Sequence, residues 1–296
     1  MTGAHGEASG RVTVHSADEY RRYLEMTSEE KQEFLRLEYE QRDATDTYAT
    51  SRDYNARELE ILAISRALGE PGSVLDLGCG NGYTLLALGA RLEGWRLTGI
   101  DFSPNLVRGA RALLDERRDA LASPPQFVEG DAIAYLADTA DAALDYVITE
   151  RFVQNMPTAD VQRQVLREIH RVLRPGGRLL LCEGSQTGFD ALNEIRAALG
   201  LPVIPATSRE NVSAIRFDDA QLERFVTDGV GFELVDKVGF STFFLIARVL
   251  HPLLVAPDPP RFDAAINDLA RQIQERSPMH PGYGSNSLWV LDKRAG

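Results

Sequence analysis

Short apolar runs alternate with amphipathic segments through the middle of the chain. Runs of four to six apolar residues are typical of buried strands, and apolar residues spaced three or four apart are typical of helices. Val161, Val165, Ile169 and Val172 form one such helical stripe. The pattern predicts strands at 73–77, 96–100, 126–129, 144–149 and 178–182, and helices at 83–92, 104–121, 133–138 and 159–173. This alternation predicts a doubly wound α/β fold with a parallel sheet.

Helical segments precede this region, and a looser pattern follows it. The chain is predicted to be helical from Ala17 to about Gln41, where Thr27 and Glu30 can form a capping box. A second helix is predicted at 54–68, ending at Gly69. Beyond Cys182 we expect helices at 188–199, 218–228, about 242–255 and 262–276, and strands at 232–240 and 287–292.

A glycine loop directly follows the first predicted strand. Gly78, Gly80 and Gly82 alternate with other residues there, and Asp76 lies within the strand before them. Glycine lacks a Cβ atom and tolerates positive φ, so the backbone of such a loop can approach a ligand closely. Ligands of open α/β sheets bind beyond the carboxyl ends of the strands, which is where this loop lies.

Acidic residues follow the next two strands and indicate which ligand the loop takes. Asp101 ends the second strand and suits a ribose diol, and Asp131 follows the third and can accept the amine of an adenine. A dinucleotide site uses the spacing Gly-x-Gly-x-x-Gly, whereas this loop reads Gly-x-Gly-x-Gly. Asp76 would repel a diphosphate but suits an ammonium or sulfonium group. These features point to S-adenosylmethionine rather than NAD.

The same residues resemble the motifs of a known family. The segment 74–82 is similar to the first motif of class I S-adenosylmethionine-dependent methyltransferases of the small-molecule type. The segments 99–104, 129–132 and 173–181 resemble the second-strand motif, the adenine motif and the entry to the fifth strand. The resemblance covers roughly residues 70–184. It implies a Rossmann-like, mostly parallel sheet of seven strands, the last of them antiparallel.

The resemblance also implies roles for the matching residues. The methionine part of the cofactor would pass the glycine loop, and its adenosine would lie across the ends of the second and third strands. The implied contacts are Gly78, Gly80, the Cys79 backbone and Asp76 for the methionine moiety, Asp101 for the ribose, Phe102, Asp131 and Ala132 for the adenine, and Thr149 and Glu150 beside the methyl group. Tyr48 and Arg52 are candidates to close over the cofactor, and Arg52 is a candidate partner of the methionine carboxylate.

Methyl transfer needs donor and acceptor in line and water excluded, and a base only when the acceptor is a hydroxyl. Candidates for a base are Glu150, Glu183, His251 and His280. Arg151 is a candidate acceptor contact, although Glu150 and Arg151 are equally well explained as a local ion pair. His251 precedes a proline after an apolar run, which favours a packed or capping histidine over a base.

The domain organisation follows from where the alternating strands and helices lie along the chain. We expect an N-terminal helical cap at 1–68 and a methyltransferase core at 69–296. Two insertions, at about 184–216 and 241–286, leave from the carboxyl ends of strands and are expected to form a lid over the methyl group and the acceptor. Acceptor choice would then depend on the segments that match the family least.

Composition limits the class of partner. The 296 residues carry a net charge of −12, which disfavours nucleic acid and anionic membranes as partners. The two cysteines form no Cys-x-x-Cys pair, which suits a reducing cytoplasm, and no apolar stretch has the length of a membrane span or the features of a signal peptide. No His, Cys and acid spacing indicates a metal site. Oligomeric state is open, a homodimer included.

The sequence thus predicts an enzyme that transfers a methyl group from S-adenosylmethionine to an oxygen or nitrogen of a small biosynthetic metabolite. Three alternatives stay open at this point. A nicotinamide-dependent oxidoreductase shares the sheet but needs its third glycine one position later. A protein that binds the cofactor without methylating, as a scaffold or a cyclase-like catalyst, would carry the same cofactor residues. An acceptor presented on a carrier protein or peptide would need a broad exposed groove.

Overall fold

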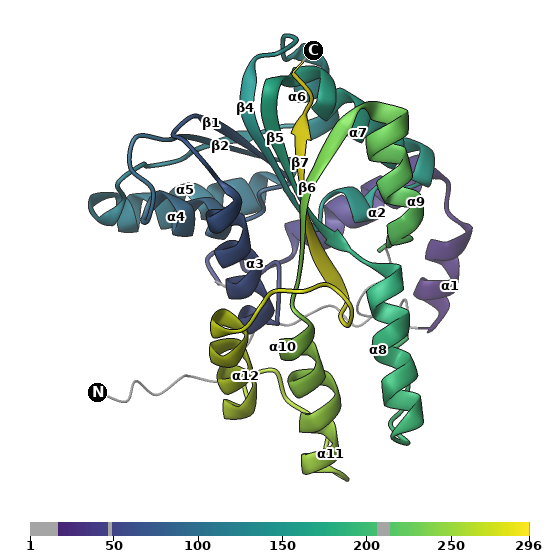
Figure 1. Ribbon diagram of the computed structural model, residues 1–296. Coiled ribbons are helices and arrows are strands. Elements are labelled where there is room, and N and C mark those ends of the chain that lie inside the picture. Colours follow the sequence, from purple (N-terminus) through teal and green to yellow (C-terminus); the bar gives the residue numbers. More distant parts are fainter. Residues whose placement is uncertain (1–16, 47–48, 206–213, 296) are drawn as a thin grey trace.

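Seven strands form one sheet at the centre of the molecule (Figure 1). The structure is a computed structural model and describes residues 17–46, 49–205 and 214–295. The strands are β1 (Ser73–Leu77), β2 (Arg96–Asp101), β3 (Gln126–Glu129), β4 (Leu144–Glu150), β5 (Leu173–Gly184), β6 (Phe232–Gly239) and β7 (Asn286–Lys293). Their order is β3-β2-β1-β4-β5-β7-β6. β7 is antiparallel to both neighbours, and the first five strands are parallel, so the predicted fold class is confirmed.

Both faces of the sheet are covered by helices, because successive strand residues point to opposite faces. On one face, β-strand residues such as Val74, Ile148 and Leu180 pack against α3 (Tyr54–Ala67), α4 (Tyr83–Gly89) and α5 (Pro104–Arg117). On the other, Leu75, Val147 and their neighbours pack against α6 (Ala132–Asp138), α7 (Ala159–Val172) and α9 (Asp219–Arg224). The near-continuous apolar runs of the sequence therefore correspond to strands buried on both sides.

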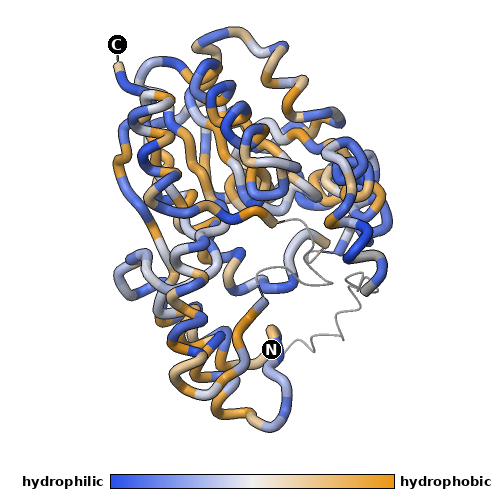
Figure 2. Tube along the Cα trace, turned by 90° about the vertical axis from the view of Figure 1, so that its right-hand side faces the viewer, coloured by the Kyte–Doolittle hydropathy of each residue, from blue (hydrophilic) through white to orange (hydrophobic). Residues whose placement is uncertain are grey.

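A group of helices extends beyond the sheet at the edge where β5 and β6 end (Figure 1). It consists of α8 (Gln186–Ala198), α10 (Ser241–Leu245), α11 (His251–Val255) and α12 (Ala265–Arg276). A π-helical turn, Ile246–Leu250, joins α10 to α11, so the expected helix at about 242–255 is present with a local change of pitch. In Figure 2 this part of the chain shows many hydrophobic positions.

The N-terminal segment forms α1 (Ala17–Glu25) and α2 (Ser28–Glu40) rather than one continuous helix. The break is the predicted capping box: the Thr27 amide donates to the Glu30 carboxylate at 2.7 Å, and the Glu30 amide donates to Thr27 Oγ1 at 3.3 Å. None of the residues of α2 is buried. The helix is attached to the core at its end, where Asn105 donates to the carbonyl oxygens of Glu40 and Arg42 at 3.2 and 2.7 Å.

Two element boundaries differ from the prediction. β5 begins at Leu173 rather than 178, because Leu173 pairs with Leu144 ahead of the Pro-Gly-Gly segment. The helix predicted from 262 begins at Ala265. The buried Asn267 side chain donates to the carbonyl oxygens of Arg261 and Phe262, which holds these two residues in the preceding loop. No helix among the described residues is long and apolar enough to cross a membrane.

Candidate active site

A cavity of about 900 Å³ lies at the carboxyl ends of β1 to β4. Its volume is within the range of small-molecule and cofactor sites. The wall combines the glycine loop, the ends of β2 and β3, the segment after β4, and one side of α2. The cavity therefore lies at the position that the sheet topology predicted.

The glycine loop adopts a backbone that only glycine tolerates well. Gly78, Gly80 and Gly82 have φ values of +71°, +56° and +73°. A Cβ atom on Gly78 would lie 2.6 Å from a ring carbon of Phe152, and one on Gly80 would lie 2.7 Å from a methyl carbon of Thr50. The amides of Gly78 and Cys79 donate to the Ile100 carbonyl, which fixes the loop against β2. Gly78, Cys79 and Gly80 thus present closely packed backbone to the cavity.

Asp76 is the most unusual acid of the cavity wall. It is 2% exposed, and its Oδ1 atom has no hydrogen-bond partner among the described residues. Burial, with the nearby carboxylates of Glu150 and Asp101, raises its pKa well above the usual range. A buried carboxyl without a partner is costly unless a ligand group pairs with it. Its position beside the glycine loop therefore suits a cationic ligand group.

Asp101 is held rigidly at the end of β2. Its two carboxylate oxygens accept hydrogen bonds from the amides of Gly80 at 2.8 Å and Ser103 at 2.9 Å. Burial raises its pKa to about 6, although both amide hydrogen bonds oppose that shift. The alternative that Asp101 caps α5 does not apply, because Ser103 accepts the hydrogen bond from the Leu106 amide. Asp101 also lines the cavity, and each of its carboxylate oxygens can accept a further hydrogen bond.

The residues expected at the adenine end also meet in the cavity wall. Phe102, Asp131 and Ala132 line it together. Asp131 is the N-cap of α6 and accepts from the amides of Ile133 and Ala134 at 2.7 and 3.0 Å. The ring of Tyr39, on α2, lies edge-on to Phe102 with centroids 6.0 Å apart. α2 therefore adds an aromatic side chain to this end of the cavity, which the sequence did not indicate.

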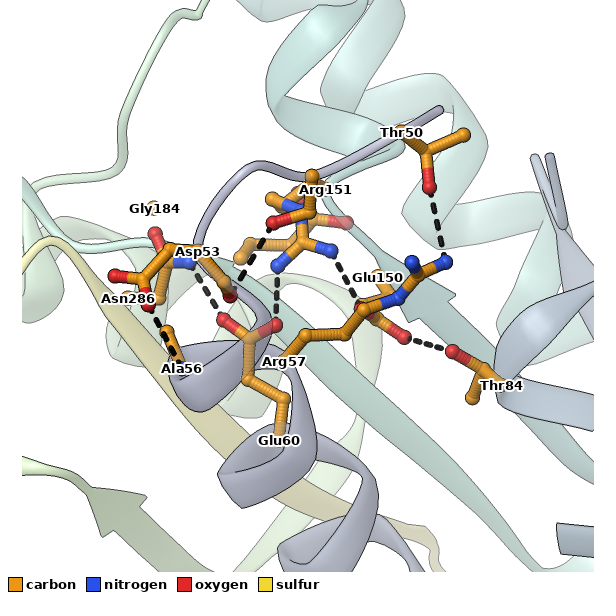
Figure 3. A network of polar contacts seen from close by, with 12 residues as sticks. Thr50, Asp53, Ala56, Arg57, Glu60, Thr84, Glu150, Arg151, Gly184 and Asn286 are labelled. Atoms are coloured by element: carbon orange, nitrogen blue, oxygen red, sulfur yellow. Dashed lines mark hydrogen bonds and ion pairs between the residues drawn. The ribbon is translucent and has the colours of Figure 1, made fainter. Parts of the chain in front are cut away.

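A buried network of charged side chains lies at the end of β4 (Figure 3). Arg151 has a φ of +56°, which is unusual for a residue with a side chain. Its guanidinium pairs with Glu60 of α3 and, at 2.6 Å, with Glu150. Thr84 Oγ1 donates to the other Glu150 oxygen at 2.6 Å, and Asn286 of β7 donates to Glu60 at 2.7 Å. The network thus joins α3, α4, β4 and β7.

Burial and the two arginines set the charge state of this network. Burial alone would raise the pKa of Glu150, but Arg151 and Arg57 outweigh it and hold this pKa below its usual range. Burial raises the pKa of Glu60 to about 7, despite the opposing effect of Arg151. The alternative interpretation of Glu150 and Arg151 as an ion pair is therefore what the structure shows. Both residues also line the cavity, so the pairing does not remove them from it.

Arg57 is a cavity residue that the sequence analysis missed. It lies in the first turn of α3, is 4% exposed, and lines the cavity near Asp76 and Glu150. Its Nη2 donates to Thr50 Oγ1 at 3.0 Å, and its guanidinium carbon lies 4.2 Å from the centroid of the Tyr83 ring. Arg52, the predicted cation of this region, is exposed and also lines the cavity. No local sequence pattern distinguishes the buried arginine from the exposed one.

Four predicted residues are not among those that line the cavity. Glu183 is buried behind the wall, and its carboxylate accepts from the amides of Phe152, Val153 and Gln154 at 2.9 to 3.1 Å. His251 is buried at the start of α11, Thr149 is buried within β4, and His280 is exposed elsewhere. Glu183 thus positions the segment after β4. Tyr48 lies outside the described residues.

The two predicted insertions contribute unequally to the cavity. Among the described residues that follow Pro157, only Phe262 lines it. The described part of the 184–216 insertion contributes no lining residue, whereas α2 contributes several. No group of three or more His, Cys, Asp or Glu residues suited to a metal ion occurs in the described part of the chain.

Comparison with known proteins adds to this geometry. A sequence profile described as a methyltransferase domain matches residues 75–179. The demethylmenaquinone methyltransferase of Thermus thermophilus is 30% identical over 61% of this chain and 78% of its own length. The ubiquinone/menaquinone biosynthesis C-methyltransferase of Syntrophotalea carbinolica is 30% identical over 59% of this chain and 70% of its own length.

Solved structures share the fold at lower identity. A methyltransferase from Methanosarcina mazei that depends on S-adenosylmethionine is 18% identical, with a TM-score of 0.52 over 79% of this chain and 98% of its own. The 4+2 cyclase SpnF is 23% identical, with a TM-score of 0.51 over 81% of this chain and 82% of its own. These two likenesses support the fold alone.

Proposed function

The chain belongs to the class I S-adenosylmethionine-dependent methyltransferases, and from this we propose that it methylates an electron-rich small molecule of the phenol or enol type, at carbon or at oxygen. When bound, the cofactor supplies an electrophilic methyl group on a sulfonium. The unpartnered Asp76 oxygen beside the glycine loop is the single observation that carries the placement of the cofactor in this cavity.

The proposed cofactor orientation follows the charges of the wall. Asp76 pairs with the amino group of the methionine moiety, and Arg57 and Arg52 supply the cations for its carboxylate. Asp101 accepts hydrogen bonds from the ribose hydroxyls. The adenine lies between Phe102 and Ala132, with Asp131 at its edge and Tyr39 closing over it. The glycine loop lets the methionine chain pass close to the backbone.

The acceptor class is inferred from the state of two further acids of the cavity wall, Glu150 and Asp53. Glu150 is ion-paired with Arg151 and has a lowered pKa, so it is a weak base, and the carboxylate of Asp53 is engaged in an ion pair with Arg248. No histidine lines the cavity among the described residues. An acceptor in this site therefore needs a nucleophile that requires no strong base. The electron-rich carbon of a phenol or enol provides one, because it can attack the methyl group before the hydroxyl loses its proton. The hydroxyl of a phenol or enol is also far more acidic than that of an alcohol, so a weak base suffices for attack through oxygen.

Two further observations support this acceptor class. The wall of the cavity beyond β4 includes the apolar side chains of Phe152, Met156 and Pro157, which suit the flat face of a ring. The relatives from Thermus thermophilus and Syntrophotalea carbinolica are named for methylation in quinone biosynthesis, and the second of them for transfer to carbon. For this reason carbon replaces nitrogen among the expected acceptor atoms, and oxygen is kept. The helical cap at 1–68 and the insertion at 241–286 remain part of the proposal as the segments that enclose the acceptor.

A product assay tests the proposal. The protein is incubated with S-adenosylmethionine and either α-naphthol or naphthohydroquinone, and the products are analysed by mass spectrometry and proton NMR. We expect S-adenosylhomocysteine and a singly methylated ring compound, with NMR placing the methyl group on carbon or oxygen. Gly78→Val is the control without a functional cavity, because its Cβ would collide with Phe152.

Two results would contradict this proposal. Methylation of amines but not of phenols or hydroquinones would show that the acceptor class is wrong. Tight cofactor binding without any S-adenosylhomocysteine across the panel would favour a protein that binds the cofactor without methylating.

A further inference from the structure

Phe262 has a position that no other described residue after Pro157 shares. It lines the cavity, although every other lining residue comes from residues 29–157. Its side chain is nevertheless 43% exposed, which is unusual for a large apolar residue facing a cavity. An aromatic ring that is half in water at the rim of a site gains free energy when a ligand covers it.

The backbone of Phe262 is anchored by a buried residue. Asn267, 1% exposed in α12, donates from its side-chain amide to the carbonyl oxygen of Phe262 at 3.0 Å and to that of Arg261 at 2.8 Å. The ring therefore projects from a fixed point of the loop before α12. A rim residue whose backbone is held by a buried supporting residue is typical of a built contact site.

The ring itself rests on Arg248. The guanidinium carbon of Arg248 lies 4.8 Å from the centroid of Phe262 and 5.8 Å from that of Phe243. Arg248 belongs to the π-helical turn Ile246–Leu250, a local structure that is frequent at functional sites.

Arg248 is in turn fixed to the N-terminal side of the cavity. Its guanidinium is ion-paired with Asp53, and both side chains are less than one-fifth exposed, at 19% and 16%. Asp53 caps α3 by accepting from the Ala56 amide at 3.1 Å, and it also lines the cavity. A chain of contacts therefore runs from the cap of α3 through Arg248 to Phe262, along the rim of the site.

We propose that Phe262 is a specificity-determining residue that packs against the apolar face of the acceptor, with Arg248 as its positioning residue. This inference rests on the proposed function, since it takes the acceptor to be a flat, phenol-type molecule. Phe262 is not among the residues assigned above to the cofactor, so in this proposal it acts on acceptor binding and leaves cofactor binding unchanged. Arg248 acts only through the orientation of the Phe262 ring.

The test compares Phe262→Ala with Leu254→Ala. Leu254 is a matched control because it lies in α11 at 65% exposure and does not line the cavity. Binding of α-naphthol to each protein is measured by calorimetry with S-adenosylhomocysteine at saturation. We expect Phe262→Ala to weaken naphthol binding about tenfold, and Phe262→Trp to retain it. Affinity for S-adenosylhomocysteine should change less than about twofold in all variants, which also shows that they are folded.

A second variant tests the positioning role. Arg248→Lys keeps the ion pair with Asp53 but loses the flat guanidinium under the ring. It should raise KM for α-naphthol, in agreement with the weaker naphthol binding expected of Phe262→Ala. Its kcat should stay within about twofold of the wild-type value. A variant that lowers kcat and leaves KM unchanged would overturn this role.

The outcomes separate the inference from the function on which it rests. If the wild-type protein binds α-naphthol, and Phe262→Ala has the same affinity for it as Leu254→Ala, the assignment of Phe262 is overturned. The proposed function is not affected by that result. Wild-type protein that binds the cofactor product but neither binds nor methylates α-naphthol or naphthohydroquinone would overturn the proposed acceptor class, and the inference with it.

Discussion

Asp76 is the residue on which the proposed cofactor site depends most. Its buried, unpartnered oxygen should pair with the amino group of S-adenosylmethionine, and a charged hydrogen bond of this kind contributes about 1.5–3 kcal/mol. We therefore expect Asp76→Asn to weaken cofactor binding by about tenfold to a hundredfold, measured by calorimetry. The variant should fold, because it removes a buried carboxyl whose pKa is raised by burial.

Methylthioadenosine is the matched ligand for this prediction, since it lacks the amino acid part. Its affinity should be the same for wild-type protein and Asp76→Asn. Equal losses for both ligands would mean that Asp76 supports the loop and does not contact the amino group.

At the scale of single residues, the sequence predicted those whose position follows from a strand end. Asp76, Gly78 and Asp101 lie in or directly after strands, so the topology of the sheet places them in the cavity. Glu183 also follows from a strand end, but its carboxylate turns back to three amides of the neighbouring segment. Phe262 was not predictable, because its position depends on contacts with residues distant in the sequence.

Between elements, the Arg151 network is the connection most sensitive to substitution. Glu60 is fully buried on α3, and Arg151 is its ion-pair partner from the end of β4. Arg151→Met leaves the Glu60 carboxylate buried without that partner, and we expect a loss of about 3–5 kcal/mol of the free energy of unfolding. Urea denaturation measures this loss. In the double variant with Glu60→Gln, a large part of the stability should return, whereas additive losses would contradict the coupling.

α2 is expected to contribute to binding and little to stability. It has no buried residue, yet several of its side chains line the cavity, Tyr39 among them. Deletion of residues 1–41 should weaken S-adenosylhomocysteine binding several-fold and shift the melting temperature by only a few degrees. Tyr39→Ala should reproduce part of the binding loss, and Leu37→Ala, on the exposed side of α2, should not. A deletion that unfolds the protein would show that α2 is part of the core.

The strands and crossover helices between residues 73 and 172 were predictable in number and order, because most strand residues are buried and the crossover helices carry apolar residues on one side. Beyond that point the pattern is less informative. The π-helical turn at Ile246–Leu250 and the late start of α12 both depend on side-chain contacts between elements. Local periodicity contains no signal for either feature.

For the whole molecule, buried acids give stability an unusual dependence on pH. Burial raises the pKa of Glu60 and Glu183 to about 7 and that of Asp101 to about 6. Their unfolded values are near about 4. Between these limits the folded protein binds more protons than the unfolded chain, so the free energy of unfolding falls as pH rises. His170, whose pKa burial lowers, acts in the opposite direction, but it is one group against three.

We therefore expect the ligand-free protein to have a higher melting temperature at about pH 6 than at about pH 7.5, as measured by differential scanning calorimetry. Glu60→Gln should reduce this difference, because it removes one of the three titrating acids. A melting temperature that rises steadily towards pH 7.5 would contradict the assignment of these acids as protonated near neutrality.

The account depends above all on S-adenosylmethionine occupying the cavity at the ends of β1 to β4. Calorimetric titration of the wild-type protein with S-adenosylmethionine, S-adenosylhomocysteine and NAD tests this claim most directly. The account predicts binding of both adenosyl ligands at micromolar concentrations, with no binding of NAD. A folded protein that binds neither adenosyl ligand, or that binds NAD instead, would contradict it.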